Sequence, residues 1–457
     1  MTTLTDAEIS ADLAERGIRN LLFTMVDQAG IQRIKLLPAA RVPSAVNRGA
    51  GFSLTSALLL CSDDAIADLE EFPQAQGDVR LFADYDAMRV IDAKTGLAWA
   101  PADQFTPAGE PFAVCQRHAL RKQVRRAEAL GLELRVAFEL EFTLFRGDAD
   151  SPVFAVNGPG YGLTPILEVE EWATDLLDAC QTAGIEVEQI HPEYGLGQLE
   201  MSMRPKDPVS AVDEYIATRI LVARTALAHG MRVSFAPVSA IDTAGNGCHI
   251  HFSAITSDGS NVFAEGNDGT GFSTTAGELL AGLVEHLRAS VAMLAPSINS
   301  YARLQPGHFS GAYVCWGVEN REAALRYIPG VSGRRGEGAN VEVKTADGSA
   351  NPYLAVATIL ACALQGVEDH LDAPHAVVGS PDALASSSDT ESIAASRVQR
   401  MPADLRESLD LLAGNSMLRA QLGDSLVDSY IGIRQREWDA YRDTPHEERV
   451  ALLRWKY

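Results

Sequence analysis

Short apolar runs with strand-like alternation dominate the first hundred residues. A helical pattern over 5–17 comes first, and two strand-like runs, NLLFTMVD and IQRIKLLP, then flank a turn at 28–30. The segment RVIDAKTGLAWA has the same form, with its turn at 94–96. One helix and two hairpins predict a small β-rich domain at the start of the chain.

The hydrophobic pattern changes after a stretch rich in Pro and Gly at 101–111, a composition typical of a domain boundary. Beyond it, helical segments alternate with strands, and the stretch from 300 to 330 contains mostly turn signals. We expect an α+β protein with a small domain over 1–105 and a large domain over 106–457. The main segments predicted in the large domain are helices at 117–131, 170–184, 207–230, 275–295 and 353–364, and strands at 133–145, 247–255 and 339–346.

Two carboxylates interrupt the strand RVAFELEFTLF. Successive side chains of a strand point to opposite faces, so Glu139 and Glu141 share one face while Leu140 and Phe142 share the other. Like charges on a mostly apolar strand are costly unless a positive group lies beside them. The strand therefore predicts a cation at this face.

Similar residue types recur on other predicted strands. HPEYGLGQLE carries His191, Glu193 and Glu200; HIH places His249 and His251 on one face; and Glu342 shares a face with Lys344. The predicted ligand set contains five carboxylates and one imidazole: Glu139, Glu141, Glu193, Glu200, Glu342 and His249. Hard oxygen donors suit Mg²⁺ or Mn²⁺ better than zinc.

Basic residues are frequent between positions 303 and 344. They are Arg303, Arg321, Arg326, Arg334, Arg335 and Lys344. Guanidinium groups match carboxylate and phosphate oxygens, and metals together with arginines are typical of phosphoryl transfer. No GxxxxGK[ST] loop is present, so an ATP-using enzyme of this kind would not be a P-loop enzyme.

Composition limits the partners and the compartment. A net charge of -23 argues against nucleic acid and anionic membranes. The six cysteines include no CxxC pair, the N-terminal segment lacks the pattern of a secretory signal, and the apolar run at 353–364 is too short to cross a bilayer. We expect a soluble cytoplasmic protein.

Six ordered motifs resemble those of the glutamine synthetase family, and the similarity extends over nearly the whole chain. They are FELEF, HPEYGLGQLE, GNGCHIH, RLQPG, NREAALR and VEVKTADGSANPYLA. The resemblance implies a small β-grasp-like N-terminal domain and a large catalytic domain with a curved antiparallel sheet that forms a funnel flanked by helices. It also implies a homo-oligomeric ring of six or twelve chains, with active sites shared between neighbours.

The resemblance also implies roles for individual residues. Glu141, Glu193 and Glu200 would bind a first divalent ion on the glutamate side, and Glu139, His249 and Glu342 a second ion that holds the nucleotide phosphates. The nucleotide-contacting positions would be Glu188, His251, Ser253 and Arg326, and the substrate-binding positions Gly245, Arg303, Arg321 and Lys344. Arg303 and Arg321 would be the catalytic arginines. Asn340 and Lys344 stand where arginines are usual in the family.

The implied reaction has two steps. The γ-carboxylate of glutamate attacks ATP to give γ-glutamyl phosphate, and an amine then displaces phosphate. Mg²⁺ or Mn²⁺, two or more ions per site, would serve as cofactor, and ATP, glutamate and the amine would be the small-molecule substrates.

The acceptor site departs from the pattern of ammonia-using members. Phe309 stands where they carry a glutamate, and Ser53 stands where they carry an aspartate. Loss of two carboxylates weakens binding of a small bare cation, and a phenylalanine adds an apolar wall that suits carbon. We predict an acceptor pocket of Ser53, Tyr161 and Phe309 for an organic amine, such as ethanolamine or another short amine, with a polyamine less favoured.

Three alternatives stay open at this point. The chain is an ammonia-dependent glutamine synthetase, a non-catalytic relative with a structural or regulatory role, or a two-metal hydrolase. The complete ligand set speaks against the second. The arginines, and the lack of a clear water-activating base, speak against the third.

Overall fold

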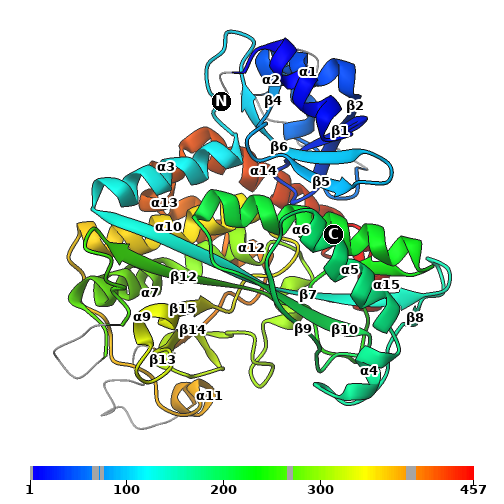
Figure 1. The fold of residues 1–457 in the computed structure, drawn as a ribbon. Coiled ribbons are helices and arrows are strands. Elements are labelled where there is room, and N and C mark those ends of the chain that lie inside the picture. Colours follow the sequence, from blue (N-terminus) through cyan, green and yellow to red (C-terminus); the bar gives the residue numbers. More distant parts are fainter. Residues whose placement is uncertain (1–3, 64–71, 73–76, 265–270, 387–397) are drawn as a thin grey trace.

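The computed structural model describes residues 4–63, 72, 77–264, 271–386 and 398–457, and its first part is a small sheet covered by two helices (Figure 1). The sheet has the strand order β2-β1-β6-β4-β3, with β5 paired to β6. Its elements are α1 (Asp6–Glu15), β1 (Asn20–Val26), β2 (Gln32–Pro38), α2 (Val42–Asn47), β3 (Ala50–Ser53), β4 (Asp78–Ala83), β5 (Arg89–Asp92) and β6 (Leu97–Phe105).

Local sequence signals explain the beginning of this part. Thr5 and Glu8 form a reciprocal capping box at the start of α1. The strands β1 and β2 form an antiparallel hairpin, as expected. β5 and β6 form the second predicted hairpin. The stretch 101–111, which we expected at the domain boundary, begins inside β6, whose residues up to Phe105 are buried.

The large sheet has ten strands among the described residues and the order β16-β13-β14-β15-β12-β7-β10-β9, with β8 and β11 also paired to β7. Its strands are β7 (Leu132–Arg146), β8 (Val153–Phe154), β9 (Val187–Pro192), β10 (Gln198–Met203), β11 (Arg232–Ser234), β12 (Cys248–Thr256), β13 (Tyr313–Val318), β14 (Ala323–Ile328), β15 (Asn340–Val343) and β16 (Gln399–Arg400). All pairs are antiparallel except β13 with β14. The expected α+β fold class and curved sheet are confirmed.

Helices cover one face of this sheet and its edges. They are α3 (Gln116–Ala129), α4 (Leu163–Leu167), α5 (Glu170–Thr182), α6 (Pro208–Ala228), α7 (Thr274–Leu294), α8 (Ser300–Arg303), α9 (Arg335–Gly338), α10 (Pro352–Glu368), α11 (Pro381–Ala385), α12 (Leu405–Gly414), α13 (Ser416–Leu422), α14 (Asp424–Tyr441) and α15 (His446–Leu453). No helix in the described ranges is long and apolar enough to span a membrane.

The helix layer determines which face of β7 is free for chemistry. Phe138 stacks on Tyr215 of α6 with ring centroids 4.5 Å apart, and Phe142 meets Trp172 of α5 edge to face. The even-numbered side chains therefore pack against helices, on the upper side of the sheet in Figure 1. Because alternation is strict, Glu139 and Glu141 lie on the opposite face.

The stretch at 300–330 differs from the expectation of loops. It contains α8 and the parallel pair β13 and β14. Gly311 precedes β13, and the turn at Asn320 separates β13 from β14. The turn residues hid these strands, since each run is only six residues long.

Buried charges join the two parts of the chain. Arg117 of α3 pairs with Asp84 and Asp103 from the small sheet at 2.8 Å and with Asp213 of α6 at 2.7 Å, and its side chain is 3 % exposed. The division at 105 and 106 stays a prediction, although β6 ends at Phe105.

Candidate active site

Strand register places the predicted metal ligands in rows across the sheet. Glu141 of β7 lies opposite Glu200 of β10, and Glu139 lies opposite His249 of β12. His251 of β12 lies opposite Glu342 of β15. Four strands far apart in sequence thus direct their polar side chains to one face.

The three residues predicted for the second ion lie in mutual contact. His249 Nδ1 is 2.9 Å from Glu139 Oε2 and 3.2 Å from Glu342 Oε1. His251, predicted to contact the nucleotide, is nearby, with Nε2 3.3 Å from the other oxygen of Glu139. The structure therefore brings this set together.

The three residues predicted for the first ion are neighbours as well. Glu141 and Glu200 are buried, and each of the pairs Glu141–Glu200 and Glu141–Glu193 is close enough for mutual repulsion. Gln198 and the backbone N–H of Gly247 both donate to Glu141 Oε2, at 2.8 and 2.7 Å. The two sets are contiguous, because ligand atoms of Glu139, Glu200 and His249 all lie within 4.8 Å of one another.

The pKa values record the cost of this crowding. Burial first, and then the neighbouring Glu200, raises the pKa of Glu141; burial and Glu141 do the same to Glu193. For Glu139, hydrogen bonds from His249 and His251 outweigh burial and hold its pKa well below its usual value. Burial lowers the pKa of His251, but the hydrogen bond and the charge of Glu139 outweigh burial and raise this pKa to about 9.

This donor set fits divalent cations. Carboxylates outnumber histidines in each of the three donor groups at this face, and hard oxygen donors are the ligands that Mg²⁺ and Mn²⁺ prefer. A bound ion would replace repulsion with coordination.

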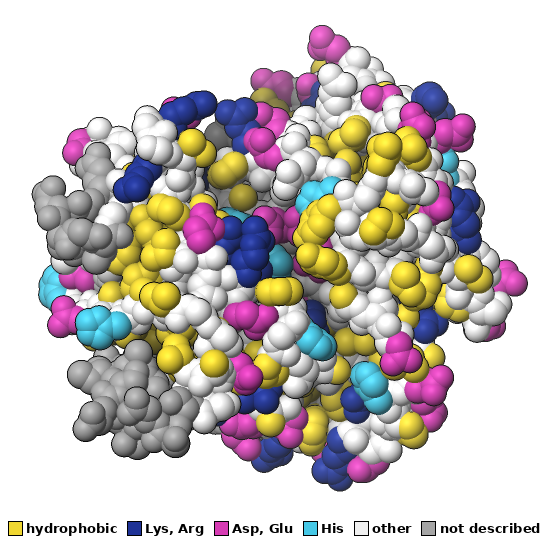
Figure 2. All heavy atoms as spheres, turned by 90° about the horizontal axis from the view of Figure 1, so that it is seen from below, with side chains coloured by type: hydrophobic (Ala, Val, Ile, Leu, Met, Phe, Trp, Pro, Cys, Tyr) yellow, Lys and Arg dark blue, Asp and Glu magenta, His cyan; other side chains and the backbone are white. Residues whose placement is uncertain are grey.

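Three of the predicted basic residues have partners at this site: Arg326 and Lys344 bind a carboxylate, whereas Arg303 binds backbone carbonyls. Arg326 Nη1 and Lys344 Nζ contact the two oxygens of buried Glu342 at 3.0 and 2.8 Å. Arg303 donates through Nη2 to the carbonyls of Thr345 and Ala346 at 2.6 and 3.0 Å. Figure 2 shows the face below the sheet, where dark blue, magenta and cyan side chains gather around a central hollow.

Arg321 and Gly245 complete the predicted substrate positions. Arg321 lies in the turn between β13 and β14, exposed and without a partner among the described residues. A Cβ atom added at Gly245 would lie 2.3 Å from the carbonyl oxygen of Pro237 and 3.0 Å from Cγ of Arg303. Only glycine allows the loop to approach Arg303 so closely.

A groove adjoins the second set of ligands on the nucleotide side. Glu139, His251 and Ser253 line it, as do residues 337–340. Asn340 Oδ1 accepts a hydrogen bond from His251 Nδ1 at 3.0 Å. Glu188 lies exposed on β9 and is not among the residues that line this groove.

The three predicted acceptor residues are not all brought together within one chain. Tyr161 is 57 % exposed, and its hydroxyl donates to Glu193 Oε2 at 3.2 Å. Phe309 is 50 % exposed in the loop after α8. Ser53 lies on β3 of the small sheet, which the helix layer separates from the ligand-bearing face (Figure 1).

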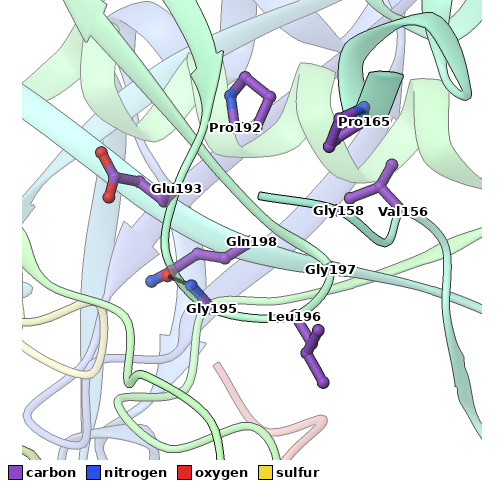
Figure 3. A pocket seen from close by; sticks show the side chains of 9 residues that line it. All are labelled: Val156, Gly158, Pro165, Pro192, Glu193, Gly195, Leu196, Gly197 and Gln198. Atoms are coloured by element: carbon purple, nitrogen blue, oxygen red, sulfur yellow. Dashed lines mark hydrogen bonds between the residues drawn. The ribbon is translucent and has the colours of Figure 1, made fainter. Parts of the chain in front are cut away.

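A small hollow lies beside Glu193, between the turn of β9 and β10 and the segment 156–165 (Figure 3). Gln198 Oε1 accepts the backbone N–H of Gly195 at 2.8 Å and so fixes this turn. The Glu193 side chain points away from the hollow. Gln198 thus supports the turn between β9 and β10 that carries the predicted metal ligand Glu193.

Two residues of the site had no predicted role. His191 on β9 lies between Glu200, at 3.2 Å, and Glu193, at 3.5 Å, and the hydrogen bond to Glu200 raises its pKa to about 9. Its place in HPEYGLGQLE was a usable signal. Glu322 contacts the loop of Phe309, and no sequence pattern indicated that contact.

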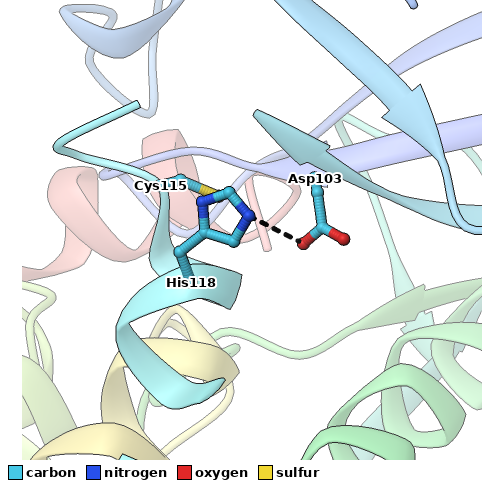
Figure 4. A group of neighbouring side chains, drawn as sticks. All are labelled: Asp103, Cys115 and His118. Carbon is cyan, nitrogen blue, oxygen red and sulfur yellow. Dashed lines mark ion pairs between the residues drawn. The ribbon is translucent and has the colours of Figure 1, made fainter. Parts of the chain in front are cut away.

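A further donor group lies outside this face, where Asp103, Cys115 and His118 meet (Figure 4). Arg117 and Arg121 already pair with Asp103, and burial raises the pKa of the Cys115 thiol to about 11. A protonated thiol beside a carboxylate that already pairs with two guanidinium groups makes a poor cation site.

Comparison with known proteins agrees with this geometry. The sequence model of the family "Glutamine synthetase, catalytic domain" matches residues 113–452. A γ-glutamylpolyamine synthetase of Streptomyces coelicolor (strain ATCC BAA-471 / A3(2) / M145) is 38 % identical over 452 residues, covering 98 % of this chain and 96 % of the relative. A γ-glutamylethanolamide synthetase of the same strain is 31 % identical over 386 residues, covering 82 % and 78 %.

A solved structure described as a novel glutamine synthase homolog superposes with a TM-score of 0.84 at 30 % identity, covering 96 % of this chain and 99 % of that one. Sequence and fold agree over nearly the full length. The chain therefore belongs to the glutamine synthetase family and is a carbon–nitrogen ligase.

Proposed function

We propose that this protein uses ATP to join the γ-carboxylate of glutamate to an organic amine. The observation that carries the acceptor assignment is Phe309, an apolar and half-exposed side chain at the place where ammonia-using members carry a glutamate. Two relatives named for γ-glutamyl products of organic amines support the same class.

The residues of the site suit the first step, attack of the glutamate γ-carboxylate on the γ-phosphorus of ATP. Divalent ions bound by the two ligand sets supply charge neutralisation at the phosphate oxygens. Arg303 is held by two backbone carbonyls and directs the rest of its guanidinium toward the loop of Gly245, where we place glutamate. Among the residues that the structure describes, Arg321 has no ion-pair partner to release before it binds the transferred phosphoryl group.

In the second step the amine nitrogen attacks the acyl carbon of γ-glutamyl phosphate, phosphate leaves, and the nitrogen loses a proton. Phe309 and Tyr161 offer partly exposed aromatic surface to the carbon chain of the amine. Binding of an organic amine is thereby favoured over binding of ammonium.

Polyamines belong among the candidate acceptors. Phe309 by itself disfavours a polyamine, because the distal ammonium of a polyamine needs an acid nearby. Glu322 accepts the backbone N–H of Phe309 at 3.1 Å, so a carboxylate lies directly behind this loop. The relative with 38 % identity is named for polyamines.

The test is an acceptor panel. Purified protein with glutamate, ATP and Mg²⁺ is given ammonium, ethanolamine, isopropylamine, putrescine or spermidine separately, and phosphate release is followed together with product mass. We expect a γ-glutamyl adduct of an organic amine, with kcat/KM at least roughly 10-fold above that for ammonium. Reactions without glutamate or without amine serve as controls.

Two results would contradict the proposal. Glutamine as the best product would make the protein an ammonia-dependent glutamine synthetase with an unusual acceptor site. No product with any amine, from a folded protein that binds ATP, would favour a non-catalytic role.

A further inference from the structure

The loop that carries Phe309 is held by one carboxylate from a neighbouring turn. Glu322 Oε2 accepts the backbone N–H of Gly307 at 3.3 Å, and its Oε1 accepts the backbone N–H of Phe309 at 3.1 Å. A carboxylate that receives two amide donors forms charge-assisted hydrogen bonds, which are stronger than neutral ones.

The two hydrogen bonds to Glu322 hold Phe309 in a backbone conformation that phenylalanine rarely adopts. Phe309 has a φ of 52°, in the left-handed region, which disfavours side chains other than those of Gly, Asn and Asp. Such a backbone persists only where its surroundings impose it. Within the loop, the Gln305 carbonyl accepts the His308 N–H and the Ser310 hydroxyl. From outside the loop, Arg400 donates to the Gln305 side chain at 3.3 Å, and Glu322 holds the Phe309 amide itself.

The turn that presents Glu322 is itself anchored. Asn320 Oδ1 accepts the N–H groups of Glu322 and Ala323 at 3.1 and 3.2 Å, and its Nδ2 donates to the carbonyls of Val377 and Gly379. Arg321 lies in the same turn. One rigid turn therefore presents the arginine proposed for the phosphoryl group and holds the loop proposed for the acceptor.

From this geometry we infer that Glu322 is a positioning residue that sets the place of the Phe309 ring and thereby the selection of the amine. The inference rests on the proposed function, because it assigns Phe309 to the acceptor pocket. Glu322 need not touch the substrate to act in this way. Loss of the carboxylate lets the loop relax toward negative φ and moves the aromatic wall.

The variants that test this are Glu322→Ala and Glu322→Gln. Alanine removes both acceptors. Glutamine keeps the shape but retains only one acceptor oxygen, so its effect should lie between those of alanine and the native residue. Asp258→Asn is the matched control, since Asp258 is a turn carboxylate that accepts the Ser260 N–H at 3.1 Å, away from the site.

Hydrogen exchange gives a readout that needs no activity. We expect peptides covering 305–311 to exchange at least roughly 10-fold faster in Glu322→Ala, because two amide hydrogen bonds are lost. Asp258→Asn should leave these peptides unchanged. Unchanged exchange in Glu322→Ala would overturn the inference, whatever the enzyme makes.

Kinetics then test the link to selectivity. We expect the KM for the preferred amine to rise roughly 5-fold or more and its advantage over ammonium to shrink, while the KM for ATP changes less than about 2-fold. Equal loss for every substrate would show a general structural role and overturn the inference. Faster exchange in a protein that ligates no amine would confirm the contact and instead defeat the proposed function.

Discussion

Glu342 shows how much one buried carboxylate does in this site. Its side chain is 1 % exposed, yet its two oxygens meet Arg326, Lys344 and His249. Electrostatic interactions, first with His249 and then with Lys344, outweigh burial and hold the pKa of Glu342 at about 2. Glu342 is therefore ionised throughout the working range, as a metal ligand must be.

Substitution Glu342→Gln keeps the size of the side chain and removes its charge. We expect kcat to fall roughly 100-fold or more, because an anionic ligand of the second ion is lost. Equilibrium dialysis with Mn²⁺ should show one fewer bound ion per chain. Glu368→Gln is the control, since Glu368 forms its ion pair, among the described residues, with Arg126 of α3.

The contrary outcome is specific. If Glu342→Gln retains both the Mn²⁺ stoichiometry and a kcat within about 3-fold of the native value, Glu342 is not a ligand. If Glu342→Gln lowers the melting temperature, only its Mn²⁺ stoichiometry, and not its kcat, decides whether Glu342 is a ligand.

At the scale of elements, α7 and α10 approach so closely that only glycine fits between them. A Cβ at Gly282 would lie 2.2 Å from the Cys362 carbonyl oxygen, and one at Gly366 would lie 2.0 Å from that of Glu278. Both obstacles are backbone atoms, which cannot rotate away. The pair lies in the helix layer that supports the sheet (Figure 1).

We therefore predict that Gly282→Ala lowers the melting temperature, at a cost of about 1–3 kcal/mol for overpacking. Gly414→Ala is the control: that glycine ends α12 and has nothing within 4 Å of an added Cβ. Its alanine variant should be neutral or more stable by up to about 1 kcal/mol. Equal melting temperatures for the two variants would contradict the prediction.

Strands and helices differ in how far the sequence revealed them. The long helices and the strands β7, β12 and β15 were predicted because their hydrophobic period extends over enough residues or their polar residues alternate. β13 and β14 were missed because glycines, Asn320 and Arg321 surround two short runs. The outward direction of Glu139 and Glu141 followed from alternation alone.

At the scale of the whole molecule, the small sheet presents an edge with exposed apolar side chains. β2 ends the strand order, and Ile34 and Leu36 on it are 53 % and 57 % exposed. Members of the family form ring oligomers. We predict that this edge contacts a neighbouring chain, which would also explain why Ser53 lies far from Phe309 within one chain.

The measurement is the mass in solution by light scattering. We expect six or twelve chains of 49.1 kDa for the native protein and smaller species for the double variant Ile34→Asp, Leu36→Asp. Activity should fall with the mass, because the family resemblance implies active sites shared between neighbouring chains. A double variant that keeps both its mass and its activity would place the interface elsewhere.

The sequence by itself determined the residue types, the shared face of the polar residues on the strands that it predicted, and the family. These properties depend on periods of two or 3.6 residues and on ordered motifs, both of which are local. Only the tertiary structure decided that β12 lies between β7 and β15, that His191 bridges two predicted ligands, and that Glu322 holds the loop of Phe309. Those contacts join residues far apart along the chain or depend on the path of a turn, and no local period encodes them.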